Sequence, residues 1–135
     1  METGEWEIWK DLSQNIWGHS CTRTQDKVVI AGGVNIAFAI IGRTSILDLN
    51  TREETVIGEL HGPRAWFGMA TIDDKVFAFG GMSPLYTTRD QYSDIQELDL
   101  DTGEWVVTDN NLATSRGISS FASAVVHLED VCPSS

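Results

Sequence analysis

The chain has 135 residues, of which 41% are hydrophobic and 21% charged, and its formal net charge is −11. This composition is that of a folded globular protein rather than a disordered one. The negative charge repels phosphate groups, so we expect neither nucleic acid nor an anionic membrane as a partner. The simplest interpretation of the negative charge is that it keeps the protein soluble. The more specific alternative is that the protein binds a basic surface of a partner protein.

The chain shows no sign of secretion or membrane insertion. Its two cysteines, Cys21 and Cys132, are too few and too far apart for the disulfide framework of a small secreted protein. The acidic N-terminus lacks the basic-then-apolar order of a signal peptide. The longest apolar stretch, 28–41, is interrupted by glycine and asparagine and is too short to span a bilayer. We therefore expect a cytoplasmic protein.

A repeat of about 50 residues runs along the chain, which is the sequence signature of a repeat architecture. Trp17 and Trp66 stand 49 residues apart, each ahead of the same short motif. Four motifs recur in this register: Thr-Gly-Glu-Trp at 3–6 and 102–105, Asp-Lys-Val at 26–28 and 74–76, Gly-Gly at 32–33 and 80–81, and Asp-Leu at 48–49 and 99–100.

Each period is predicted to consist of strands. Residues 28–31 and 76–79 are short β-branched or aromatic runs that end at a glycine pair, as expected for buried strands. Third strands follow after long connections, and each then turns through Asn50-Thr51 or Asp101-Thr102-Gly103, which is hairpin chemistry. Four short antiparallel strands per period make one propeller blade. The predicted fold class is therefore all-β, with four-stranded antiparallel blades.

These residues resemble the kelch family of β-propellers. The kelch repeat has a glycine pair after its second strand, a third strand bearing tyrosine or aspartate, and a tryptophan in its fourth strand. The glycine pairs, Asp48, Asp99, Trp6 and Trp105 match this pattern. Arg64 matches the segment that leads into the first strand, and Arg116 repeats it. Glu54 departs from the pattern, because it stands where the next repeat has Trp105.

The resemblance implies an incomplete kelch-type propeller, because rings contain four to eight blades and this chain holds fewer than three periods. Three states are open: a segment of a larger propeller, a ring completed by copies of the chain, or an open arc. The repeat divides the chain into the terminal strand of a preceding blade at 1–10, a first kelch repeat at 11–60, a second at 61–112, the first strand of a third at 113–126, and a divergent tail at 127–135.

The glycines and tryptophans are interpreted as structural. The glycine pairs lack the further glycines and the following helix of a phosphate loop, so we expect them to end strands beside the crowded central channel. Tryptophans 6, 17, 66 and 105 recur at the blade period and are expected to pack between blades. Trp9 lies off the repeat and is expected to be the most exposed of the five. His19 and Cys21 have no further ligands nearby in sequence, so no metal, cofactor or catalytic residue is predicted.

Partner recognition is expected on the rim loops, which vary freely on a rigid scaffold. The connection at 82–94 carries residue types favoured at interfaces. The connection at 34–44 is apolar, and it is interpreted either as an extended third strand or as a contact to a missing blade. Arg64 and Arg116 either face a rim pocket for acidic ligands or pair with turn carboxylates. The candidate partner-binding residues are Arg64, Tyr86, Arg89, Tyr92 and Arg116.

The resemblance implies a protein-interaction module, since kelch relatives serve as substrate receptors of ubiquitin ligases or as actin-associated scaffolds. The alternatives are an enzyme of the kelch-like copper oxidase or sugar isomerase kind, and a truncated product without independent function. A copper radical site needs clustered tyrosine, histidine and cysteine. The chain has two tyrosines, and neither is near a histidine or cysteine in sequence, so no enzyme is predicted.

Overall fold

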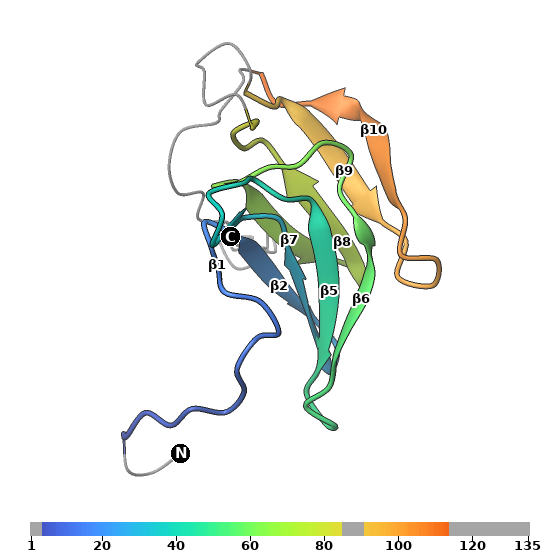
Figure 1. Ribbon diagram of the computed structural model, residues 1–135. Coiled ribbons are helices and arrows are strands. Elements are labelled where there is room, and N and C mark those ends of the chain that lie inside the picture. The colour runs from blue at the N-terminus through green and yellow to red at the C-terminus, as the bar shows by residue number, and fades with distance from the viewer. Residues whose placement is uncertain (1–3, 85–90, 114–135) are drawn as a thin grey trace, which may run out of the picture.

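The computed structural model describes residues 4–84 and 91–113 of the chain, and all their regular structure is β (Figure 1). This confirms the predicted all-β class. Blade 1 is a four-stranded antiparallel sheet in the order β2-β3-β5-β6, and blade 2 is a second one in the order β7-β8-β9-β10. A separate two-stranded sheet pairs β1 with β4. No helix among the described residues could cross a bilayer.

The strand bounds repeat from one blade to the next. In blade 1 they are β2 (Ser20–Thr24), β3 (Lys27–Ala31), β5 (Arg43–Asp48) and β6 (Glu54–Glu59). In blade 2 they are β7 (Gly68–Ile72), β8 (Lys75–Phe79), β9 (Asp94–Leu98) and β10 (Trp105–Asn111). The small sheet contains β1 (Ile16–Trp17) and β4 (Val34–Asn35).

Aspartate closes the hairpin between the third and fourth strands in both blades. Oδ1 of Asp48 accepts hydrogen bonds from the backbone N–H groups of Asn50 and Thr51, at 2.8 and 2.9 Å. Oδ1 of Asp99 accepts the equivalent pair from Asp101 and Thr102, at 2.9 and 3.1 Å. These Asx turns fix the register of both hairpins, as the predicted turn chemistry requires.

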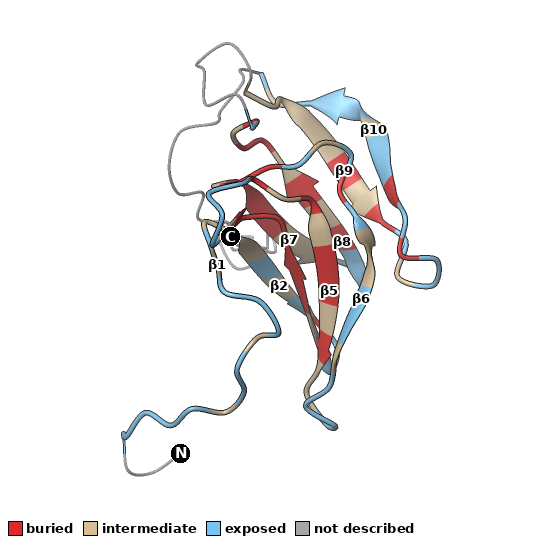
Figure 2. Ribbon diagram, in the orientation of Figure 1, coloured by how far each residue is buried: buried red, intermediate tan, exposed pale blue. Residues whose placement is uncertain are grey.

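The two blades pack face to face and bury the main core between them (Figure 2). Cross-strand partners share one face of a sheet, so the strand register shows which side chains point into the interface between the blades. The first strands are in contact, and Oγ1 of Thr22 lies 3.0 Å from Oγ1 of Thr71. The buried core residues are Val29, Ala31, Leu60, Phe67, Met69, Val76, Ala78, Leu98 and Trp105.

The glycine pairs end the second strands as predicted, but the crowding that requires glycine has another source. Gly32 has a φ of +65°, and a Cβ there would collide with the carbonyl oxygen of Arg64 and the ring of Phe67. Both belong to the segment that leads into blade 2. The neighbouring repeat, rather than a central channel, excludes a side chain at Gly32.

The tryptophans divide into three kinds. Trp105 packs between the blades as predicted, since it is 2% exposed and its Nε1 donates to Oγ1 of Thr44 at 2.9 Å. Trp66 packs partly buried against a small cluster, and Trp17 remains 41% exposed. For Trp6 the prediction of interblade packing is wrong, because the side chain is fully exposed and residues 4–10 form no strand. No third strand lies beside them in the described chain.

Trp9 is also corrected, because it is partly buried and Trp6 is the most exposed of the five tryptophans. The guanidinium carbon of Arg52 lies 4.8 Å from the centroid of the Trp9 ring, a cation–π contact. Nη1 of Arg52 also donates to the Trp9 carbonyl oxygen at 3.4 Å. The predicted first strand of a third repeat, at 113–126, and the predicted tail, at 127–135, lie outside the described part of the chain except for residue 113.

Candidate functional site

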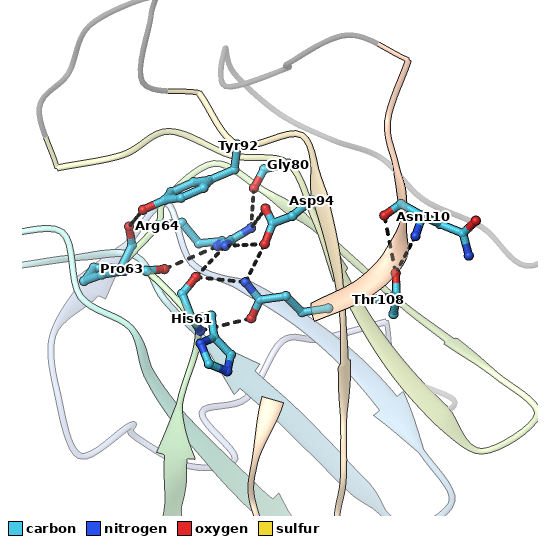
Figure 3. Close-up of polar contacts among 10 residues, drawn as sticks. His61, Pro63, Arg64, Gly80, Tyr92, Asp94, Thr108 and Asn110 are labelled. Carbon is cyan, nitrogen blue, oxygen red and sulfur yellow. Dashed lines mark hydrogen bonds and ion pairs between the residues drawn. The ribbon is translucent and has the colours of Figure 1, made fainter. Parts of the chain in front are cut away.

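The side chain of Arg64 is completely buried. It lies where β8 ends and β9 begins (Figure 3). Its Nη1 and Nη2 donate to the two carboxylate oxygens of Asp94, at 2.9 and 3.1 Å, in a bidentate ion pair. Nη1 also donates to the carbonyl oxygen of Gly80 at 3.0 Å, and Nη2 to that of His61 at 2.7 Å. The planar fork of arginine suits such an arrangement, in which a buried charge is both paired and hydrogen-bonded.

Gln96, also fully buried, completes this network. Its Nε2 donates to the His61 carbonyl at 2.8 Å and to Oδ2 of Asp94 at 2.7 Å, and its Oε1 accepts from the His61 backbone N–H at 3.0 Å. The segment at 61–64 is thereby fixed to the third strand of blade 2. Burial raises the pKa of Asp94, but the hydrogen bonds from Arg64 and Gln96 and the Arg64 charge outweigh it and hold the pKa below its ordinary value.

Of the candidate partner-binding residues, Arg64 is internal and pairs with Asp94, a carboxylate that begins a strand rather than one of a turn. Tyr92 covers Arg64, with its ring centroid 4.0 Å from the guanidinium carbon, and its hydroxyl donates to the Pro63 carbonyl at 3.4 Å. Both residues therefore contribute to the internal network. Tyr86, Arg89 and Arg116 lie outside the described residues.

A different set of side chains stands out at the rim of blade 1. Ile36 and Phe38 are 73% and 75% exposed, and the ring of Trp17 lies edge-on to that of Phe38 with a centroid distance of 5.6 Å. We call Trp17, Ile36 and Phe38 the apolar tip. It is carried by the small β1–β4 sheet, so two segments that are distant in sequence build it.

Asn35 fixes the turn that presents the apolar tip. Its Oδ1 accepts from the backbone N–H groups of Ala37 and Ala39, at 3.0 and 3.1 Å. Its own N–H donates to the Ala39 carbonyl at 3.0 Å. Phe38 has a φ of 59°, which a bulky residue rarely adopts and which surrounding contacts must maintain. The turn is therefore a defined structure with one strained residue at its apex.

The connection at 34–44 forms a turn, which rules out one of its two interpretations; the other, a contact to a missing blade, stays a prediction. The connection is not an extended third strand, because β5 begins only at Arg43 and residues 35–39 close a turn. Ile40, 7% exposed, points inward and packs with Val34 and Ala65. Val34 and Ile40 point inward on either side of the turn, while residues 36–39 between them are exposed, and this places Ile36 and Phe38 of the apolar tip outside the core.

A groove of about 610 Å³ lies between the outer strands of the two blades. It is lined by β6 and by the hairpin and strand around Trp105, and two of its lining residues, Glu59 and Glu104, are acidic. Within 4–84 and 91–113, no three His, Cys, Asp or Glu side chains gather closely enough to hold a metal ion.

The family model of the kelch motif matches residues 63–109, which contain β7, β8, β9 and most of β10. A search of curated proteins found no match to the chain. Blade 1 has the same strand order, glycine pair and Asx turn as the matched blade 2. The chain therefore carries a kelch repeat at 63–109, and its two four-stranded sheets are blades of a partial kelch-type β-propeller.

Proposed function

We propose that this chain is a protein-interaction module of the kelch adaptor type, which binds a folded partner through the apolar tip. The observation that carries the proposal is the exposure of Ile36 and Phe38, at 73% and 75%, on a turn held by Asn35. Kelch repeats are in general protein-interaction scaffolds, and the loops of a rigid scaffold are where such binding residues belong.

The chemistry of the tip supports an apolar, preorganised contact. Aromatic side chains dominate the binding energy of interfaces, and exposed apolar clusters mark interaction sites. Because the Asn35 turn is already formed, little conformational entropy remains to be lost on binding. The tip protrudes as a turn, so the partner has to supply the concave surface, as a folded domain does.

Charge plays a secondary part in this contact. Residues 33–42 contain no charged side chain, so the contact itself should depend little on salt. The net charge of −11 acts at longer range, where it accelerates encounter with a basic partner and repels acidic ones. We do not propose an enzyme. A copper radical site would need a tyrosine clustered with histidine and cysteine, whereas Tyr92, the tyrosine among the described residues, contacts Arg64 and the Pro63 carbonyl.

The test compares three immobilised proteins: the wild type, the double variant Ile36→Asp with Phe38→Asp, and Ile8→Asp as control. Ile8 is 86% exposed and lies outside every strand, so its substitution adds the same kind of charge at no structural cost. A binder captured by the wild type is then purified and titrated against all three. We expect the tip variant to lose about tenfold or more in affinity and the control to lose none. Equal binding to the tip variant and the wild type would exclude the tip as the docking element.

A further inference from the structure

β10 is the outer strand of blade 2, and no strand of the described chain pairs with its outer edge. It stands at the end of the sheet order and pairs with β9 alone. The backbone N–H of Asp99 donates to the Glu104 carbonyl oxygen, where the ladder between the two strands starts. Successive residues of a strand point their backbone groups to opposite sides. Those of Val106 therefore face β9, and those of Trp105 and Val107 face the outer edge.

The groove between the blades runs along this outer edge. Residues 102–107 form one side of it, and the end of β6 with His61 forms the other. The two sides meet at Gly58 and Gly103, where a Cβ on either glycine would collide with the backbone of the opposite blade. The groove is thus built by the two described blades, and its volume of about 610 Å³ lies in the range of ligand pockets, about 300–1,000 Å³.

The part of β10 that borders the groove lacks the usual protection of an exposed strand. Natural proteins blunt such edges with charged residues or β-bulges, which prevent pairing with other chains. In β10 both devices stand beyond the groove, because the register shifts only between Val107 and Asn111 and the first charged residue of the strand is Asp109. The run Trp105-Val106-Val107 is regular and uncharged, so it can accept one more strand (Figure 2).

The side chains around the groove determine which kind of strand fits. Glu59 and Glu104, one on each side, are exposed, and neither forms a salt bridge within 4–84 and 91–113. No lysine or arginine of the described chain lines the groove. Val107 is 46% exposed and supplies an apolar contact. Because opposite charges attract across an interface, the groove favours an extended segment with basic side chains and repels an acidic one.

We propose that the groove binds an extended, basic segment of a partner protein, which pairs with the outer edge of β10 as a fifth strand of blade 2. Added strands of this kind gain affinity from main-chain hydrogen bonds and specificity from the side chains around them. The backbone groups of Trp105 and Val107 supply the hydrogen bonds, and Glu59 and Glu104 select lysine or arginine. This site is separate from the apolar tip, which stands on the small β1–β4 sheet.

The first test titrates the protein with two fluorescent heptapeptides, in which valine alternates with lysine or with glutamate. We expect the lysine peptide to bind the wild type about tenfold or more tightly than the glutamate peptide, and the double variant Glu59→Lys with Glu104→Lys to reverse this preference. The matched control is Glu7→Lys with Glu53→Lys, because both residues are exposed, lie outside the groove and change the net charge equally.

The control variant should keep the wild-type preference. If it reversed the preference as the groove variant does, the net charge rather than the groove would attract the peptide. That result, or the absence of saturable binding of the lysine peptide to the wild type, would overturn the proposal.

The second test removes one backbone donor from the groove. Val107→Pro deletes an N–H that faces the outer edge and leaves the ladder with β9 intact, and proline is tolerated at such edge positions. Val107→Thr keeps the N–H and the shape of the side chain. We expect the proline variant to bind the lysine peptide about tenfold more weakly than the threonine variant. Slow hydrogen exchange at the amide of Val29 shows that each variant is folded. Equal binding by the two variants would mean that the peptide does not pair with β10.

The third test separates the groove from the apolar tip. The variant Ile36→Asp with Phe38→Asp should bind the lysine peptide as the wild type does, because neither residue lines the groove. Loss of peptide binding in this variant would place the peptide at the tip and overturn the proposal for the groove. Failure of the tip to bind its own partner would leave the outcome of the peptide titrations unchanged.

Discussion

The two blades share strands, turns and register, yet they hold the segment that leads into them by different chemistry. In blade 2 the arginine comes from the segment, as Arg64, and the acid begins the third strand, as Asp94. In blade 1 the residue that begins the third strand is Arg43, and the acid is Glu54 on the fourth. In both blades the polar groups of the segment that leads into the blade have hydrogen-bond partners, as buried polar groups require. The arginine and the acid that provide them stand at different positions in the two blades.

The two networks also differ in burial. The guanidinium of Arg64 is completely buried, whereas the side chain of Arg43 is 21% exposed. A buried charge that loses its partner cannot be compensated by water, and a partly exposed one can. Blade 2 should therefore depend on its network for stability far more than blade 1 does.

The largest effect is expected from Arg64→Met compared with Arg43→Met. Loss of Arg64 removes the cation of Asp94 and the donor to the carbonyl oxygens of Gly80 and His61, which should lower the free energy of unfolding by roughly 3–5 kcal/mol. Loss of Arg43 leaves Glu54 with its hydrogen bonds from Ser13 and Ser45, so it should lower the free energy of unfolding by about 1 kcal/mol or less. Urea unfolding followed by circular dichroism measures both. Equal losses in the two variants would contradict the ranking of the two networks.

A second comparison concerns the hairpins. Gly103 in blade 2 and Arg52 in blade 1 occupy the same turn position, with φ of 77° and 63°. At Gly103 a Cβ would also collide with the carbonyl oxygen of Ile57 in the neighbouring blade. We expect Gly103→Ala to lower the free energy of unfolding by roughly 1–3 kcal/mol, because both strain and a clash arise.

Arg52→Gly is the matched variant in blade 1, where no other blade of the described chain contacts the turn. Relief of the left-handed backbone offsets the loss of the Trp9 contact, so the free energy of unfolding should change by less than about 1 kcal/mol. Thermal unfolding of both variants side by side checks the pair. A neutral Gly103→Ala would mean that the blades are not in close contact at this turn.

The smallest expected effect is the dependence of stability on pH. For both Asp94 and Glu54, burial raises the pKa, but hydrogen bonds and the nearby arginine outweigh it, so each pKa lies below its ordinary value, 3.8 and 4.5 respectively. A carboxyl group whose pKa is lower in the folded state stabilises that state above its ordinary pKa. This stabilisation is lost as the pH falls through those values towards the lowered ones. Urea midpoints between pH 6 and pH 3 measure the loss, and Glu54→Gln should reduce its slope. An unchanged slope would contradict the role given to Glu54.

The repeat made most of the fold predictable, because the glycine pairs and the Asx turns are local signals at fixed spacing. The internal role of Arg64 was not predictable, since its partner Asp94 stands 30 residues away and nothing local links the two. The apolar residues at 36–41 were visible in sequence, but which of them point outward depends on the hydrogen bonds of Asn35. Trp6 was misassigned because it matches Trp105 in motif but has no third strand beside it among the described residues.

The distribution of the tryptophans gives the molecule an internal optical reporter. Indole emits at shorter wavelength in apolar surroundings, and Trp105 alone among the five is held at 2% exposure, between the blades. The short-wavelength part of the emission therefore follows the distance between the two sheets rather than the folding of either one. A separation of intact blades would shift the spectrum to the red while the circular dichroism of the strands stays the same.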